Sequence, residues 1–291
     1  MTDIDEAYRV CAQITREQAR NFHYGIRLLP PQRRAALCAL YALARRIDDI
    51  GDGDLPTPER LEALAEVRAG LDGLAGSTDP VLMAVHDASR RYPVPLPAFG
   101  ELIDGVEMDV TGRRYETFDE LVEYCRCVAG TVGRLCLGVF ASRPDPRATR
   151  YADRLGIALQ QTNILRDIRE DLSNGRVYLP QRDLDSFGVE LALDEGGSLV
   201  DKDGELAALI VASAQRARSW YDDGLRLLPL LDRRSGACTA AMAGIYRQLL
   251  DRIERGPQAV YDRRLSLTSW QKVRVATRAL VGWGPRRTGP T

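Results

Sequence analysis

Several features are scarce in this 291-residue sequence, and each scarcity excludes something. Histidine occurs only twice, and the six cysteines lack paired CxxC spacing, which argues against a zinc site. No apolar run reaches the roughly 18 residues of a membrane span, and the acidic N-terminus lacks the apolar stretch of a secretory signal. The net charge of −1 excludes bulk attraction to nucleic acid. We therefore expect a cytoplasmic protein with reduced, mostly buried cysteines.

Alternating β-branched runs and hairpin turns are also rare, whereas Ala, Leu, Arg and Glu recur with a helical period. The pattern predicts one all-α domain over residues 1–283, with mostly antiparallel helices, and a disordered tail at 284–291. Short helices around a surface loop are expected near 180–203. A chain of this length can enclose an internal cavity. The expected long helices are 3–20, 32–51, 57–75, 79–91, 97–112, 117–141, 146–174, 203–228, 234–255 and 268–281.

The predicted helix 32–51 carries an unusual polar stripe near its end. Tyr41, Arg45, Asp48 and Asp52 fall within an arc of about 60° on one helical face. A solvated face with local ion pairs is one interpretation. However, the preceding residues 37–44 are nearly all apolar, and Asp49 adds a further carboxylate to the crowd. Such crowding is costly unless a cation neutralises it, which favours a metal site.

The predicted helix 146–174 repeats this arrangement. Gly156, Gln160, Asn163, Asp167 and Asp171 share one stripe within roughly 80°. An exposed polar face is again the alternative, but a second accidental stripe in a helix with apolar flanks is a weaker explanation. Two facing carboxylate pairs would form a cage for Mg²⁺, which in proteins is commonly held by one or two carboxylates together with substrate phosphates. The two stripes therefore predict a diphosphate substrate whose diphosphate departs to leave a carbocation.

Small residues mark a third helical segment. Val128 and Val132 belong to an apolar stripe, and Ala129, Gly133 and Cys136 form a stripe of small residues beside it. Glycine inside a helix costs about 1 kcal/mol relative to alanine, so it needs a reason. Close packing of two helices is one reason. The other is a thin wall along which a long hydrocarbon can lie.

Basic groups are needed to neutralise a leaving diphosphate. Arg45 and Arg166 lie beside the two aspartate stripes. Arg263, Lys272 and Tyr246, in the last third of the chain, are further candidates, although surface positions for the two charges and a core position for the tyrosine are the favoured explanations from the residues alone. The spacing of these three residues does not decide between the interpretations.

These segments together resemble the squalene and phytoene synthases, the head-to-head trans-isoprenyl diphosphate synthases. The likeness spans roughly residues 15–280 and is carried by residues 19–30, 41–52, 124–138 and 163–180. The pattern is most similar to bacterial presqualene diphosphate synthases of hopanoid biosynthesis. It implies the isoprenoid synthase fold, with helices around a central cavity and two facing DxxxD motifs.

The resemblance assigns roles to individual residues. It implies that Mg²⁺, or Mn²⁺ in its place, is held by Asp48, Asp49, Asp52, Asn163, Asp167 and Asp171. It implies a diphosphate shell of Arg45, Asn163 and Arg166, assisted by Gln160. Positions that match residues lining the site are Phe22, Tyr41, Tyr178, Tyr246 and Arg263. The wall along the prenyl tails corresponds to Val128, Ala129, Val132, Gly133 and Cys136. Family members often carry serines near Phe22, where this chain has Ala19 and Asn21, whose amide can substitute as a diphosphate contact.

The activity expected from this resemblance is condensation of two farnesyl diphosphates to presqualene diphosphate. The alternatives are a complete squalene synthase that uses NADPH, and a synthase of dehydrosqualene or phytoene. No GxGxxG motif is present, but squalene synthases bind NADPH without one. Two rival functions remain. One is a non-catalytic assembly protein of this fold, against which the four intact aspartates argue. The other is a one-headed terpene cyclase, whose second metal motif is usually built from Asn, Ser or Thr with Glu. Downstream isoprenoid enzymes and a peripheral contact at the inner face of the membrane are further partners that the resemblance leaves open.

Overall fold

Helices make up almost all of the regular structure. The computed structural model describes residues 3–19, 22–140 and 145–281, so the expected tail at 284–291 lies outside the described residues. Within these ranges there is no strand, only an isolated antiparallel bridge between Leu193 and Leu199. The α-helices are α1 Asp3–Gln18, α2 Phe22–Ile26, α3 Pro31–Asp52, α4 Thr57–Asp72, α5 Pro80–Arg91, α6 Pro97–Val110, α7 Phe118–Cys125, α8 Thr131–Phe140, α9 Pro146–Ser173, α10 Gln181–Phe187, α11 Glu205–Gly224, α12 Arg233–Arg255 and α13 Ser269–Val281. The expectation of an all-α isoprenoid synthase fold is confirmed.

Local sequence signals explain where these helices begin. The Asp79 carboxylate caps α5 by accepting hydrogen bonds from two backbone N–H groups, and Asp232 caps α12 in the same way. Thr117 and Glu120 form a reciprocal capping box at the start of α7. Prolines at the first positions of α3, α6 and α9 fit the helical φ angle and need no N–H there.

The predicted helix 117–141 is not continuous. A π-helical turn, Arg126–Gly130, separates α7 from α8, and the N–H of Thr131 donates to the carbonyl of Arg126. A π turn inserts one extra residue into the helix and changes which side chains face a neighbour. The prediction missed it because hydrophobic periodicity does not report such a local widening. Sequence reasoning also missed the short α2, while α10 falls in the segment where short helices were expected.

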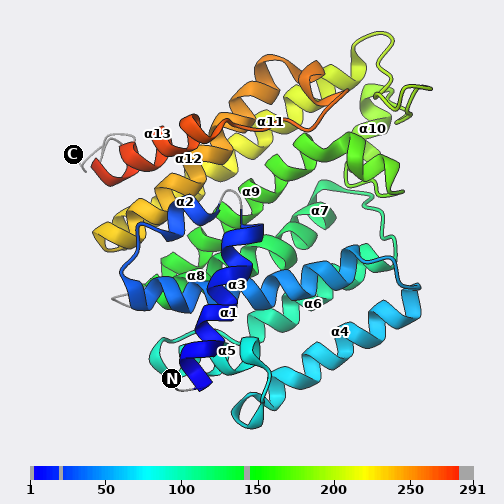
Figure 1. Cartoon of the computed structure of the whole chain (residues 1–291). Coiled ribbons are helices and arrows are strands. Elements are labelled where there is room, and N and C mark those ends of the chain that lie inside the picture. Colours follow the sequence, from blue (N-terminus) through cyan, green and yellow to red (C-terminus); the bar gives the residue numbers. More distant parts are fainter. Residues whose placement is uncertain (1–2, 20–21, 141–144, 282–291) are drawn as a thin grey trace.

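The core has two main parts, with α9 running through the middle of the molecule (Figure 1). One part is formed by α1, α3, α5, α6 and α8, and includes the fully buried Leu43, Ile47 and Phe99. The other is formed largely by α9, α11 and α12, and includes Leu209 and Tyr221. Among the described residues, no helix is long and apolar enough to cross a membrane. The two cores leave a cavity between them, and residues of both line it.

Backbone contact between α9 and the segment Arg126–Phe140 fixes the wall of this cavity. A Cβ added at Gly156 would lie 2.3 Å from the carbonyl oxygen of Ala129, and one added at Gly133 would lie 2.6 Å from the carbonyl oxygen of Ala152. Neither helix can hold a side chain at these two points. Close packing, one of the two interpretations of the small-residue stripe, therefore accounts for Gly133 and Gly156.

We predict that Gly156→Ala lowers the free energy of unfolding by about 1–3 kcal/mol, the usual cost of overpacking, because rigid backbone opposes the new methyl group. Urea unfolding followed by circular dichroism measures this change. The matched control is Gly76→Ala, where a Cβ would meet nothing within 4 Å and the change should stay within about 0.5 kcal/mol. Equal effects of the two substitutions would contradict the close-contact interpretation.

Candidate active site

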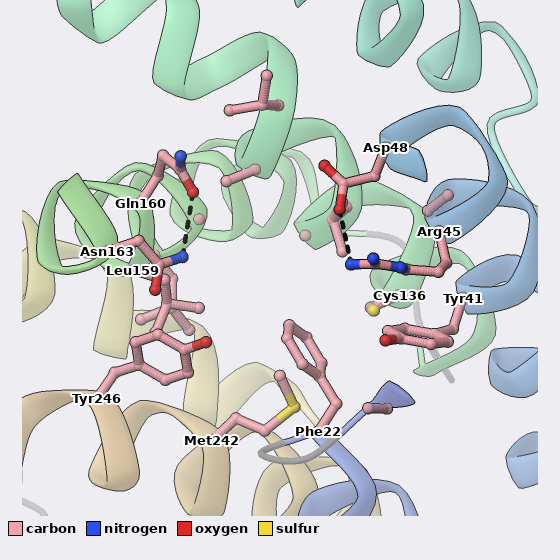
Figure 2. Close-up of a pocket in the computed structure, with 18 of the residues that line it drawn as sticks. Phe22, Tyr41, Arg45, Asp48, Cys136, Leu159, Gln160, Asn163, Met242 and Tyr246 are labelled. Atoms are coloured by element: carbon pink, nitrogen blue, oxygen red, sulfur yellow. Dashed lines mark hydrogen bonds and ion pairs between the residues drawn. The ribbon is translucent and has the colours of Figure 1, made fainter. Parts of the chain in front are cut away.

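A single large cavity collects most of the predicted site residues. Its volume is about 940 Å³, at the upper end of the range of small-molecule pockets. Along α3 its lining extends from Leu37 to Asp52, which is about 22 Å of helix. Figure 2 shows Tyr41, Arg45 and Asp48 on one side, with Gln160 and Asn163 of α9 opposite them.

The α3 side of the cavity carries carboxylates held by arginine. The Arg45 guanidinium lies 3.0 Å from Asp48 and 2.5 Å from Asp49. Asp48 lines the cavity, and its side chain is 54% exposed because it faces the open space. Arg176, from the segment after α9, donates to Asp52 at 2.8 Å and to the carbonyl oxygen of Gly51. Arg45 and Arg176 thus offset part of the negative charge of the α3 carboxylates.

The α9 side is more enclosed. Arg166 is only 8% exposed, and its Nε donates to Asp167 Oδ1 at 2.8 Å. Arg264, from the segment before α13, reaches the same carboxylate at 2.9 Å. The amide nitrogen of Asn163 donates to Gln160 at 3.2 Å, whereas the buried Asn163 Oδ1 has no hydrogen-bond partner. This unpaired oxygen is a ready ligand for a cation.

A further carboxylate, Asp109, comes from a third helix, α6, and completes the polar end of the cavity. Its two oxygens accept hydrogen bonds from the hydroxyls of Tyr124 and Tyr178, both at 2.8 Å. The tyrosine rings stack on one another with centroids 5.1 Å apart. Asp109, Tyr124 and Tyr178 all line the cavity, so this cluster connects its wall to the aspartate stripes.

Burial and crowding raise the proton affinity of several of these carboxylates. Burial, together with the charge of Asp52, raises the pKa of Asp48 to about 6. Burial and the charge of Asp167 raise the pKa of Asp171 to about 7. Burial also raises the pKa of Asp109 to about 6, although its two tyrosine hydrogen bonds act in the opposite direction. Each raised pKa means that the ionised carboxylate is less stable in this site than in water, so a bound cation would stabilise it.

The remainder of the cavity is apolar. Its walls include Val128, Val132 and Cys136, together with Phe22 and Met242. Figure 2 shows Cys136, Phe22 and Met242 around the same space. The lining extends to Phe140 at the end of α8 and to Leu227 beyond α11. The cavity is polar at one end and apolar along the rest of its length. This shape suits the amphiphilic ligand with a diphosphate head that the sequence predicts.

The cavity brings together most of the predicted residues. Those that line it are Phe22, Tyr41, Arg45, Asp48, Asp52, Val128, Ala129, Val132, Gly133, Cys136, Gln160, Asn163, Arg166, Asp167, Asp171, Tyr178, Tyr246 and Lys272. Their individual roles stay predictions, since the structure shows position and not chemistry.

Two of the expected residues lie outside the lining of the cavity. Asp49 does not line the cavity but pairs with Arg45 at the edge of the stripe, because it is one residue out of phase with Asp48. Arg263 is exposed and also lies outside the lining; its neighbour Arg264 occupies the position expected of it. Asn21 lies outside the described residues.

Sequence reasoning missed Asp109, Arg176 and Arg264. Asp109 follows the acidic residues Glu101, Asp104 and Glu107 in α6, so its charge alone gave no signal, and its place between the apolar Met108 and Val110 was the feature that could have drawn attention to it. Arg176 and Arg264 follow helix ends in loops, where periodicity carries no information. Their placement depends on tertiary contacts.

Comparison with known proteins agrees with this geometry. The sequence profile of the squalene/phytoene synthases matches residues 15–271. The chain is 57% identical over 282 residues to a phytoene synthase of Mycobacterium tuberculosis, covering 97% of this chain and 93% of that protein. It is 37% identical to a phytoene synthase of Arthrospira platensis, covering 92% and 90% of the two chains. A crystal structure of a dehydrosqualene synthase with a ligand superposes with a TM-score of 0.84 at 27% identity, over 96% of this chain and 97% of the other.

Fold and cavity thus define an all-helical head-to-head prenyltransferase. The chain belongs to the squalene/phytoene synthase family. The expected assignment to presqualene diphosphate synthases of hopanoid biosynthesis, with farnesyl diphosphate as substrate, is wrong, because the similar proteins at 57% and 37% identity are phytoene synthases. The alternative that named phytoene synthase fits these findings better.

We predict that the metal-free protein loses stability as the pH rises from about 4 to 7. The pKa of Asp171 is raised to about 7 in the folded protein, against 3.8 ordinarily, so its stabilising contribution is complete below about pH 4 and is lost as the pH rises through 7. Asp171→Asn removes the share of Asp171 in this dependence and should raise the unfolding free energy near neutral pH by up to about 4 kcal/mol, because the pKa shift from 3.8 to about 7 corresponds to about 1.4 kcal/mol per pKa unit.

Thermal and urea unfolding in EDTA across this pH range measure the effect. Asp54→Asn, in the exposed loop between α3 and α4, is the control and should leave the pH profile as it is in the parent protein. If Asp171→Asn and the parent protein gave parallel profiles between pH 4 and 7, the crowding at Asp171 would be refuted.

Proposed function

We propose that this protein is a phytoene synthase, which condenses two geranylgeranyl diphosphates head to head. The main support for this proposal is the similarity to a phytoene synthase, which is 57% identical over 97% of this chain. The cavity supports the proposal because a polar end with carboxylates and arginines adjoins a long apolar body. Two amphiphilic substrates with diphosphate heads and long prenyl tails require such a space.

The polar end suits Mg²⁺ bound together with a diphosphate. The donor set consists of hard carboxylate and amide oxygens, and the unpaired Asn163 Oδ1 and the proton-binding Asp48 and Asp171 all gain from a nearby cation. No three carboxylates among the described residues come close enough to hold a metal on their own. Diphosphate oxygens would supply the missing ligands. Bound there, the metal would stabilise the charge of the departing diphosphate.

The protein's own groups would do the remaining work at the first ionisation. Arg45 and Arg166 can donate hydrogen bonds to the diphosphate as the C1–O bond of one substrate breaks. The enclosed apolar walls would keep water from the allylic cation. Phe22 and Tyr41, with ring centroids 6.1 Å apart, present aromatic faces to the cavity and suit a cationic centre.

Carbon–carbon bond formation and two proton losses complete the proposed reaction. The C2–C3 double bond of the second substrate attacks the cation, and loss of a proton closes a cyclopropane ring. Departure of the second diphosphate and loss of a second proton give phytoene, so no hydride donor such as NADPH is consumed. Burial raises the pKa of Tyr41 to about 12 and that of Tyr178 further, so these phenols stay protonated at neutral pH. The released diphosphate is therefore the better proton acceptor.

The substrate prediction is that kcat/KM for geranylgeranyl diphosphate exceeds that for farnesyl diphosphate by at least tenfold, since each further apolar group in the cavity adds binding energy of about 0.8 kcal/mol per CH₂. Incubation of each substrate with Mg²⁺, followed by hydrocarbon analysis, measures both rate and product. Phytoene from the C20 substrate supports the proposal. Preference for the C15 substrate, with dehydrosqualene as the product, would overturn it.

The metal prediction compares two adjacent aspartates. Asp48→Asn should reduce turnover on the order of 100-fold or more, because its carboxylate faces the cavity, while Asp49→Asn should cost less than tenfold. Removal of divalent cations with EDTA should stop turnover of the parent protein, and added Mg²⁺ should restore it. Undiminished turnover in EDTA, or equal effects of the two substitutions at unchanged melting temperature, would contradict the proposed metal site.

A further inference from the structure

A group of charged side chains behind the cavity wall plays no part in the proposed reaction. Arg134 of α8 places two nitrogens on the carboxylate of Glu101, a residue of α6, at 2.7 and 2.8 Å. Arg126 donates to the same carboxylate, and Arg134 Nε lies 2.9 Å from Asp153 of α9. These four residues are called here the π-turn clamp, and none of them lines the cavity. The clamp joins α6 and α9 to the chain between them.

The π turn Arg126–Gly130 brings both arginines to one carboxylate. Two residues eight positions apart in a regular α-helix point in directions that differ by about 80°. The π turn holds one extra residue, so Arg126 and Arg134 are spaced like residues seven apart, with about 20° between them. The extra residue therefore aligns both arginines with Glu101, and the ion pairs in turn stabilise the π turn.

The same π turn lies tightly between α6 and α9. A Cβ added at Gly105 of α6 would lie 2.6 Å from the side chain of Val128, and α9 contacts the backbone of the turn at Ala129. Asp153 lies directly beside the end of the turn, since a Cβ added at Gly130 would meet its carboxylate at 2.9 Å. Val128 and Ala129 line the cavity, so the wall is held from behind by contacts with both helices.

We propose that Glu101 and Arg134 are positioning residues, which hold the π turn so that Val128 and Val132 form a fixed wall for the prenyl chain. This inference rests on the proposed function, because it takes the apolar part of the cavity as the place of that chain. The clamp touches no substrate. It sets how well the tail binds, and it leaves the diphosphate head to the polar end of the cavity.

Electrostatics keeps the clamp closed. The hydrogen bonds from Arg134, assisted by that from Arg126, outweigh burial and lower the pKa of Glu101 to about 2, so this carboxylate is ionised throughout the neutral range. The contact through two nitrogens of Arg134 also fixes the orientation of the carboxylate. Removal of the Glu101 charge would leave two guanidinium groups near each other with Asp153 as the remaining carboxylate of the clamp, and their repulsion would open it.

Binding of unreactive substrate analogues tests this role. In prenyl thiodiphosphates, sulfur replaces the oxygen at C1 and slows ionisation, and the geranyl, farnesyl and geranylgeranyl forms differ in tail length. Titration calorimetry with Mg²⁺ measures the affinity of each analogue and of inorganic diphosphate. Glu101→Gln should weaken binding of geranylgeranyl thiodiphosphate on the order of tenfold, the loss expected when about two methylene groups leave the wall. Binding of inorganic diphosphate should stay unchanged.

Dependence on tail length is the result that a purely structural role would not give. The loss should grow from the geranyl to the geranylgeranyl analogue, and in turnover Glu101→Gln should raise KM more than it lowers kcat. An equal loss for all analogues and inorganic diphosphate would overturn the proposal, and so would unchanged binding of all of them.

Glu254→Gln is the matched control. Glu254 and Asp251 pair with Arg218 in a comparable partly buried group, which joins α11 to α12 and does not line the cavity. This substitution should lower the melting temperature as Glu101→Gln does, and should leave the affinity for every analogue as in the parent protein. If it weakened tail binding equally, general loosening of the fold would explain the effect and the proposal would fall.

A second variant keeps the test decisive if Glu101→Gln does not fold. Arg126→Met removes one contact and leaves Arg134 paired with Glu101, so it should produce a smaller loss that again grows with tail length. Combined with Glu101→Gln it should add no further loss, because both changes remove the same contact. Additive losses would show that the two residues act independently, which contradicts a clamp.

The binding measurements involve no catalysis and therefore separate this inference from the proposed function. A loss of binding that grows with tail length, in a protein that forms no phytoene, would refute the function and support the clamp. Phytoene formation by the parent protein, together with unchanged binding by Glu101→Gln, would refute the clamp and leave the function in place.

Discussion

Crowded negative charge at one end of an apolar cavity is the constraint on which the rest of the structure depends. Asp48, Asp109 and Asp171 all have raised pKa values because the surrounding protein desolvates them near other carboxylates, although the Asp48 side chain is 54% exposed toward the cavity. The protein offsets this charge with arginines, of which Arg166 is itself buried and Arg176 reaches in from beyond α9. Such a site costs stability, which fits the cation and the diphosphate of the proposed function.

The scaffold holds this site through contacts of backbone with backbone. Gly156 and Gly133 let α9 lie directly against the segment that carries Val128 and Val132. One contact therefore sets both the α9 carboxylate stripe and the apolar wall. A side chain at either glycine would move the wall relative to the stripe, so the polar and apolar ends of the cavity are positioned by the same pair of elements.

Local patterns made α3 and α9 predictable, and tertiary contacts made the rest unpredictable. The aspartate stripes follow from a 3.6-residue period, so their placement needed no knowledge of the fold. Asp109 joins the site only because α6 packs beside α3, and Arg264 rather than Arg263 enters it because of the direction in which a loop approaches α9. The π turn at Arg126–Gly130 was likewise not predictable from the hydrophobic period of its own helix. The same motifs led to the wrong branch of the family, since the relatives at 57% and 37% identity are phytoene synthases, so the motifs alone did not decide the substrate.

The two ends of the cavity impose different requirements on what leaves it. A diphosphate is released into water, and the polar end with Arg45 and Arg176 faces partly exposed carboxylates. A long hydrocarbon gains nothing from water and needs an apolar phase. The cavity has both kinds of lining, with Arg45, Asp48 and Arg176 at its polar end and Val128, Val132 and Cys136 along its apolar wall. Under the proposed function, one cavity therefore serves both parts of an amphiphilic substrate, because α3 and α9 carry the polar stripes while the segment packed against α9 carries the apolar wall.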